Sequence, residues 1–116
     1  PVCSSAASDV YKRQLDELIL PPPPEDESNN FDVYQNYELV AKSRDELKEN
    51  LLMNGIGTLI QWGGMAIHHF RDLGFNQKLP KTDAFFEGCI MLPMNMFISN
   101  ADVDYVCDSI KKFYRS

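Results

Sequence analysis

The sequence predicts a two-layer α/β domain, in which helices pack on a three-stranded sheet. Apolar side chains alternate along residues 31–41 and form a short run at 89–92, as is typical of half-buried and buried strands. Residues 44–54 and 100–115 instead carry apolar side chains at helical spacing. Glycines and prolines separate these segments at short intervals. Strands that alternate with helices predict the α/β class.

The first predicted elements are a strand at 31–41 and the helix that follows it. Val33, Tyr37 and Leu39 are residues that favour strands and share one face of the alternation. Ser43 stands three residues before a glutamate, and this spacing predicts a capping box at the start of the helix. Gly55 is placed as the glycine that ends it.

The middle of the chain predicts a second strand at 57–62, a helix at 65–73 and a loop at 75–81. A short helix capped by Thr82 and ended by Gly88 then leads into a third strand at 89–92. The last helix is the clearest, because Ser99 and Asp102 have capping-box spacing and an apolar stripe follows them.

Composition and charge define the domain and limit its function. The 116 residues are enough for one modest core, and 44% of them are apolar. We expect residues 1–14 to be a non-native or disordered tail, 15–30 a linker containing four prolines, and 31–116 the domain. The net charge of -6 argues against nucleic-acid and membrane partners. No secretion signal is evident, and three cysteines without a CxxC pair indicate thiols in a reducing, cytoplasmic compartment.

One stretch combines residue types that suit a polar ring-shaped ligand. Gln61 offers an amide, Trp62 a broad aromatic face and His68 a titratable ring, at a predicted strand-to-helix junction. The alternative is that Trp62 belongs to the core and the histidines lie on the surface. We expect no metal site, because adjacent residues such as His68 and His69 point about 100° apart on a helix. No catalytic triad or acid/base pair can be argued.

Three segments carry a family resemblance. RDELKENLLMNGIGTLIQW (44–62), LPKTDAFFEGCIMLPMNMFIS (79–99) and ADVDYVCDSIKKFYR (101–115) resemble the C-terminal portion of the DegT/DnrJ family of pyridoxal-phosphate-dependent sugar aminotransferases. The resemblance implies the small domain of a fold-type I enzyme that transfers an amino group from glutamate or glutamine to a nucleotide-linked keto-sugar, in amino-sugar or polysaccharide biosynthesis. It also implies a homodimer. No segment matches the family's lysine motif, so we expect no catalytic or cofactor-binding residue here and an inactive fragment.

The resemblance places substrate contacts at Gln61, Trp62 and His68, with Gln35 as a further candidate. Family members often have His-Tyr where this chain has Gln61-Trp62, and prolines where it has glycines, so the identity of the sugar stays open. The alternative to a sugar aminotransferase is a free-standing α/β ligand-binding or regulatory module without catalysis.

Overall fold

The computed structural model describes residues 15–21 and 35–116. The tail predicted at 1–14 and the segment 22–34 lie outside the described residues, so the boundary at 14 remains a prediction. The described elements, in chain order, are β1 (Leu18–Ile19), β2 (Tyr37–Ala41), α2 (Arg44–Met53), α3 (Pro80–Gly88), β3 (Cys89–Leu92) and α4 (Asn100–Arg115), with three 3-10 turns between α2 and α3. No helix in the described part of the chain is long and apolar enough to cross a membrane.

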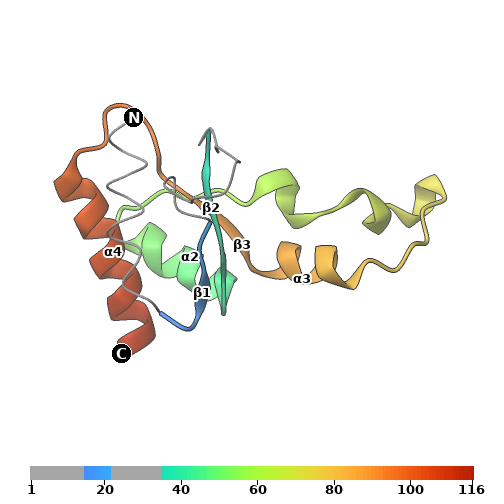
Figure 1. Cartoon of the computed structure of the whole chain (residues 1–116), viewed down its shortest axis with the longest axis horizontal. Helices are drawn as coiled ribbons and strands as arrows, with labels where there is room; N and C mark the ends of the chain where they lie inside the picture. Colours follow the sequence, from blue (N-terminus) through green and yellow to red (C-terminus); the bar gives the residue numbers. More distant parts are fainter. Residues whose placement is uncertain (1–14, 22–34) are drawn as a thin grey trace, which may run out of the picture.

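The sheet has three antiparallel strands in the order β1-β2-β3. Together with helices on one face, it forms the predicted α/β two-layer fold (Figure 1). The edge strand comes from an unexpected place, because Leu18 pairs with Ala41 and Ile19 with Val40. Residues 18–19, which we expected to belong to a linker, are therefore part of the sheet.

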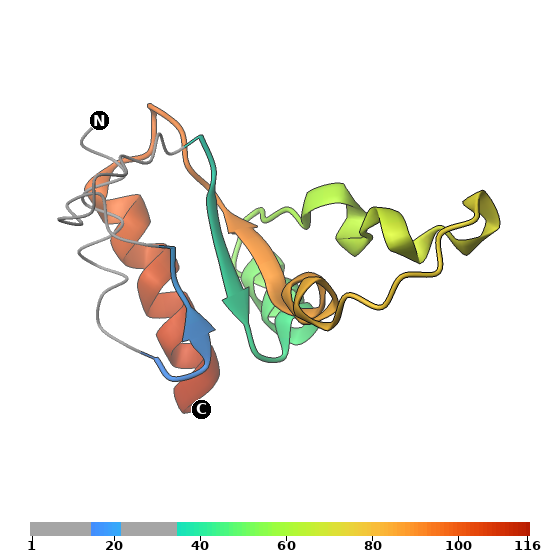
Figure 2. The ribbon, with the colours of Figure 1, turned by 45° about the vertical axis from the view of Figure 1, so that its right-hand side comes forward.

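The core lies between one face of the sheet and helices α2 and α4. Tyr37, Leu39 and Ala41 alternate toward the helices and are nearly fully buried. Leu51 from α2 and Ile110 from α4 belong to the same apolar cluster. Figure 2 shows β2 and β3 crossing the middle of the body, with α4 on the side of β1. The period-two pattern of β2 leaves alternate side chains on the opposite face of the sheet.

The ends of α2 and α4 follow the sequence in two of the three positions predicted for them, Gly55 and Ser99. Ser99 caps α4, since its hydroxyl accepts the Asp102 amide proton and the Asp102 carboxylate accepts from the Ser99 backbone. Gly55 ends α2 in the left-handed conformation, with φ +76°. The capping box predicted at Ser43 is wrong. Ser43 itself is left-handed, with φ 49° and no side-chain cap, because it turns the chain directly from β2 into α2.

The segment from 61 to 88, named the arm, differs most from the sequence prediction. The strand predicted at 57–62 is reduced to one bridge, Leu59 to Met91, followed by a 3-10 turn at Gln61–Gly64. The helix predicted at 65–73 consists of two short 3-10 turns, Ile67–His69 and Arg71–Leu73. Helix α3 begins at Pro80, at a position where proline's missing N–H costs nothing, so Thr82 is not its cap. Figure 1 shows the arm projecting from the body.

Candidate functional site

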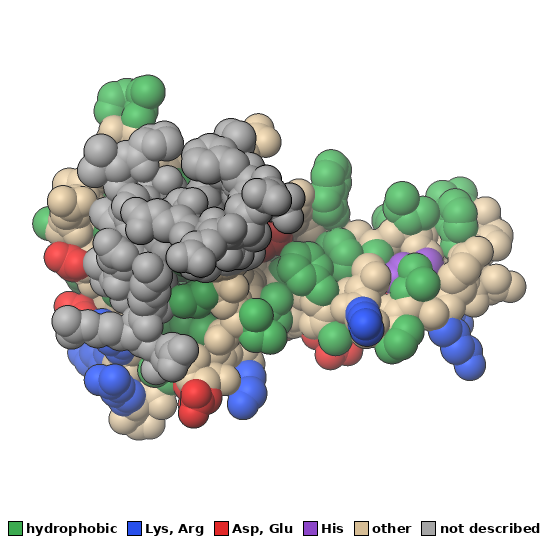
Figure 3. All heavy atoms as spheres, in the orientation of Figure 1, with side chains coloured by type: hydrophobic (Ala, Val, Ile, Leu, Met, Phe, Trp, Pro, Cys, Tyr) green, Lys and Arg blue, Asp and Glu red, His purple; other side chains and the backbone are tan. Residues whose placement is uncertain are grey.

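The arm carries an unusual amount of exposed apolar surface. Of the fourteen large apolar side chains that are exposed in the described ranges, half lie in the arm. Figure 3 shows apolar side chains gathered along this projection, around the two histidines. Exposed apolar side chains gathered on one projection are typical of a binding site or an interface.

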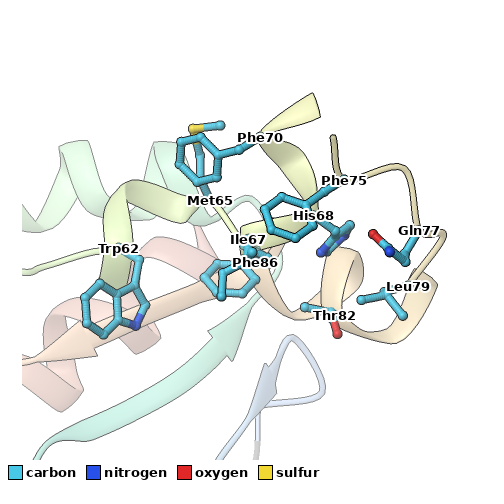
Figure 4. Close-up of a pocket in the computed structure, with 11 residues that line it drawn as sticks. Trp62, Met65, Ile67, His68, Phe70, Phe75, Gln77, Leu79, Thr82 and Phe86 are labelled. Carbon is cyan, nitrogen blue, oxygen red and sulfur yellow. The ribbon is translucent and has the colours of Figure 1, made fainter. Parts of the chain in front are cut away.

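A cavity of about 840 Å³ opens between the 3-10 turns and helix α3. Its lining is mainly aromatic and aliphatic, with Trp62 and Phe86 among its members. The polar side chains in the lining are His68, Gln77 and Thr82. Figure 4 shows the Trp62 ring at one end of the cavity, Phe86 beside it and His68 farther along. An apolar wall with few polar groups resembles a ligand pocket, in which the polar groups fix the orientation of the ligand.

Two contacts fix the base of the arm to the body. The Arg44 guanidinium donates to the backbone carbonyls of Phe86 (3.2 Å) and Cys89 (2.9 Å), so the start of α2 holds the junction of α3 and β3. Gly88 lies directly on β2, where an added Cβ would come within 2.6 Å of a Val40 methyl carbon. The arm therefore leaves the body at a tightly packed point.

Trp62 has a strained backbone and an exposed ring. Its φ of 54° and ψ of 26° lie in the left-handed region, which is uncommon for bulky residues. Gly63 and Gly64 continue in the same region without strain, because glycine lacks a Cβ. The side chain of Trp62 is 76% exposed. The interpretation of Trp62 as a core residue is therefore wrong.

Gln61 joins Trp62 to the sheet. The network around its amide orients the nitrogen toward Glu38 Oε2 (2.9 Å) and the oxygen toward the Trp62 indole N–H (3.1 Å). Strand register explains why Gln61 lies near Glu38. Glu38 and Leu59, two residues before Gln61, both pair with Met91, from opposite sides of β3. Partial burial raises the pKa of the Glu38 carboxyl above its usual value.

His68 and His69 turn toward the same carboxylate. The Nε2 atoms of both rings lie 2.6 Å from Asp83 Oδ1, and the ring centroids are 4.2 Å apart. His68 is buried, so the interpretation of both histidines as surface residues is also wrong. Hydrogen bonds from His69 and His68 lower the pKa of the Asp83 carboxyl. These bonds join the two sides of the arm.

The cluster of His68, His69 and Asp83 has the spacing of a metal site, but the His69 nitrogen that would bind the metal carries a proton. The nitrogen and oxygen atoms of His68, His69 and Asp83 lie within 4.8 Å of one another, so our reason for expecting no metal, divergent rings on a helix, does not hold. However, Nδ1 of His69 accepts the Ala66 amide proton at 3.0 Å. A neutral imidazole then carries its proton on Nε2, the atom that a metal would need. Hydrogen bonding accounts for the cluster better.

The structure brings three of the four predicted site residues to the arm. Trp62 and His68 line the cavity, and Gln61 contacts Trp62. Gln35 is exposed just before β2 and does not line this cavity among the described residues. Sequence reasoning missed Glu38, whose position on the polar side of the β2 alternation was the only signal.

The described residues that line the arm cavity do not fit pyridoxal phosphate. No lysine or arginine is among the described residues that line the arm cavity, so it offers neither a Schiff-base amine nor a cation for the phosphate. The described lysines lie in turns, on helix surfaces or in the loop before α3.

The chain is a small α/β domain with an exposed apolar arm, and sequence comparison defines its family. The chain belongs to the DegT/DnrJ/EryC1/StrS aminotransferase family, which it matches over residues 4–111. It is 29% identical over 112 residues to a pleiotropic regulatory protein of Geobacillus stearothermophilus, covering 91% of this chain and 30% of that protein.

Solved structures share the fold over about the same part of their length. A DegT/DnrJ/EryC1/StrS aminotransferase from Brucella abortus matches with a TM-score of 0.79 and 22% identity, over 99% of this chain and 30% of its own. DesV of S. venezuelae, solved with a ketimine intermediate, matches with a TM-score of 0.82 and 21% identity, over 97% of this chain and 31% of its own. A putative sugar aminotransferase from Streptococcus pneumoniae in its PLP form matches with a TM-score of 0.76 and 18% identity, over 95% of this chain and 29% of its own. The chain spans about 30% of the length of these relatives.

Proposed function

We propose that this chain is the C-terminal small domain of a pyridoxal-phosphate-dependent aminotransferase that acts on a nucleotide-linked keto-sugar. The observation that carries the proposal is the family match over residues 4–111 of the chain, combined with coverage of only about 30% of the relatives. The lysine and the cofactor phosphate site then belong to a domain outside this sequence. On its own, the 116-residue chain should not catalyse transamination.

In this proposal the arm forms one wall of the sugar site. Trp62 offers an exposed aromatic face to the apolar side of a sugar ring. His68 donates its Nε2 proton to Asp83, which leaves Nδ1 as the ring's acceptor for a sugar hydroxyl. The apolar cavity between them excludes water from the reacting end of the substrate. Bound pyridoxal phosphate would supply the electron sink for amino transfer.

The remaining proposals concern the whole enzyme. Glutamate or glutamine serves as amino donor, and the product enters amino-sugar or cell-surface polysaccharide biosynthesis in the cytoplasm. The exposed apolar surface of the arm supports contact with the large domain or with the partner in a homodimer, since such surface is seldom left open in a monomer.

The direct experiment is to recover the reading frame upstream of residue 15 from the source DNA. The proposal predicts a continuous frame that encodes a cofactor-binding domain with a Schiff-base lysine. Expression of the whole frame should then give a protein that binds pyridoxal phosphate. A frame without such a domain would overturn the proposal.

A second candidate is a binding or regulatory module without catalysis, which the similarity to a pleiotropic regulatory protein of Geobacillus stearothermophilus favours. The two candidates differ in the behaviour of residues 15–116 expressed alone. A module should be a monomer that unfolds cooperatively, whereas a domain separated from its partner surface should self-associate through the arm. Size-exclusion chromatography at several concentrations distinguishes them.

A further inference from the structure

Trp62 combines two features that need a common explanation. Its left-handed backbone costs about 1–3 kcal/mol, and such strain persists only where the surrounding structure holds it. Its ring is 76% exposed, so burial of the indole does not supply that support. Two contacts of Trp62 remain: its carbonyl accepts the Met65 amide proton at 3.2 Å, which closes the turn, and its indole N–H donates a hydrogen bond to the Gln61 side chain, which holds the ring.

Gln61 accepts this bond only in one orientation of its amide. The indole N–H is a donor, so the amide oxygen must face Trp62 and the amide nitrogen must face away from it. An ionised carboxylate can only accept hydrogen bonds, and Glu38 Oε2 lies 2.9 Å from the amide nitrogen. The charge of Glu38 therefore selects the amide orientation that holds the indole. A neutral partner at position 38 would accept either orientation.

We propose that Glu38 is a positioning residue of the sugar site, which acts through Gln61 to hold the Trp62 ring as a platform for the substrate. This inference rests on the proposed function, because it assigns the platform to the sugar. Glu38 does not contact the ligand itself.

The surroundings of Glu38 fit this role. It lies on the half-buried side of β2, opposite Met91 of β3. The Cys89 thiol interacts with Glu38: burial and then Glu38 raise the pKa of this thiol, and the Arg44 guanidinium, which donates to the Cys89 carbonyl, lowers it. Burial raises the pKa of Glu38, so protonation should release the amide at a pH above the ordinary glutamate pKa.

The test uses the only tryptophan of the sequence, whose indole N–H gives a single nitrogen-15 NMR signal. In the unaltered chain the indole proton should exchange with water at least tenfold more slowly than in Glu38→Gln. Its chemical shift should also change with pH, with a midpoint above the ordinary glutamate value of 4.5. Glu49→Gln on the exposed face of α2 is the matched control and should leave signal and titration unchanged.

A second variant keeps the test decisive if Glu38→Gln folds poorly. Gln61→Leu removes the acceptor, so its indole proton should exchange as fast as that of Glu38→Gln. The double variant should then be no faster than Gln61→Leu alone, because both changes break one path. An indole signal that is unchanged in Glu38→Gln, or additive effects in the double variant, would overturn the proposal that Glu38 holds Trp62 through Gln61.

The link to the sugar is tested in the whole enzyme that carries this chain. Glu38→Gln should raise the KM for the keto-sugar about fivefold and leave the reaction with glutamate unchanged. An altered indole signal with an unchanged sugar KM would overturn the positioning role but leave the proposed function standing. If Trp62→Ala also leaves the sugar KM unchanged, the sugar wall itself is wrong.

Discussion

Gly88→Ala tests whether the base of the arm is packed as tightly as the structure shows. The new Cβ would lie 2.6 Å from Val40 Cγ1 and 3.0 Å from the Ala41 carbonyl oxygen, whereas carbon atoms in contact are normally about 3.5–4.0 Å apart. The half-buried Val40 side chain can move aside in part, but the Ala41 carbonyl belongs to the backbone of the central strand. The strain therefore falls on β2.

The magnitude follows from two opposing effects. Overpacking of this kind costs about 1–3 kcal/mol. Replacing glycine with alanine also restricts the unfolded chain and returns about 0.4–1 kcal/mol. We expect a net loss of about 1–2 kcal/mol in the free energy of unfolding, measured by urea denaturation with circular dichroism.

Gly57→Ala is the matched control, because no atom lies within 4 Å of its added Cβ and its φ is not positive. It should leave stability unchanged or raise it slightly. Adding Val40→Ala to Gly88→Ala should relieve part of the strain caused by the new methyl group. If Gly88→Ala is as stable as Gly57→Ala, the close approach of the arm to β2 is wrong.

Three further predictions concern the body of the domain. Ile110→Ala should lower the unfolding free energy by about 2–5 kcal/mol and Ile110→Val by only about 0.5–1.5, because this core side chain is 2% exposed; equal losses in urea denaturation would contradict this. Arg44→Ala should cost about 1.5–3 kcal/mol in urea denaturation through its two carbonyl bonds, and Arg44→Lys should recover part of this loss, because both bonds come from one nitrogen and an ammonium can also donate more than one bond. Burial, followed by Glu17 and Glu46, raises the pKa of the Tyr114 hydroxyl to about 12, so stability present below pH 10 should be lost as the pH rises toward 12. Tyr114→Phe should abolish that loss in stability measured against pH.

Local sequence signals predicted the body of the domain well. The alternation of β2, the glycine that ends α2 and the capping box of α4 depend on neighbouring residues, and all three are present. Ser43 shows the limit of such signals. Its spacing fits a capping box, but the direct connection from β2 to α2 requires a left-handed turn there.

The arm was less predictable because its contacts are distant in the sequence. Residues 57–62 have strand-forming side chains, yet only Leu59 reaches β3. Residues 65–73 are apolar enough for a helix, but Ile67 and Leu73 are more than 70% exposed, so no packing against the body favours helix over separate turns.

The site was predicted only in part, because some of its contacts are also distant in the sequence. Gln61, Trp62 and His68 were recognisable by residue type and by family resemblance. Glu38 and Asp83 were not, since each reaches its partner through the pairing of segments more than ten residues apart. Asp83 lies in the first turn of α3, and neither it nor the adjacent histidines that it joins gave a local indication of a shared partner.

The central claim is that the arm forms the sugar-binding wall of an aminotransferase. The most direct measurement compares the two half-reactions of the whole enzyme with and without Trp62→Ala, each followed in a single turnover. The account predicts that amino transfer from glutamate to the cofactor is unchanged, while kcat/KM for the keto-sugar falls about tenfold or more, equivalent to about 1.4 kcal/mol. Equal losses in both half-reactions, or no loss with the sugar, would contradict it.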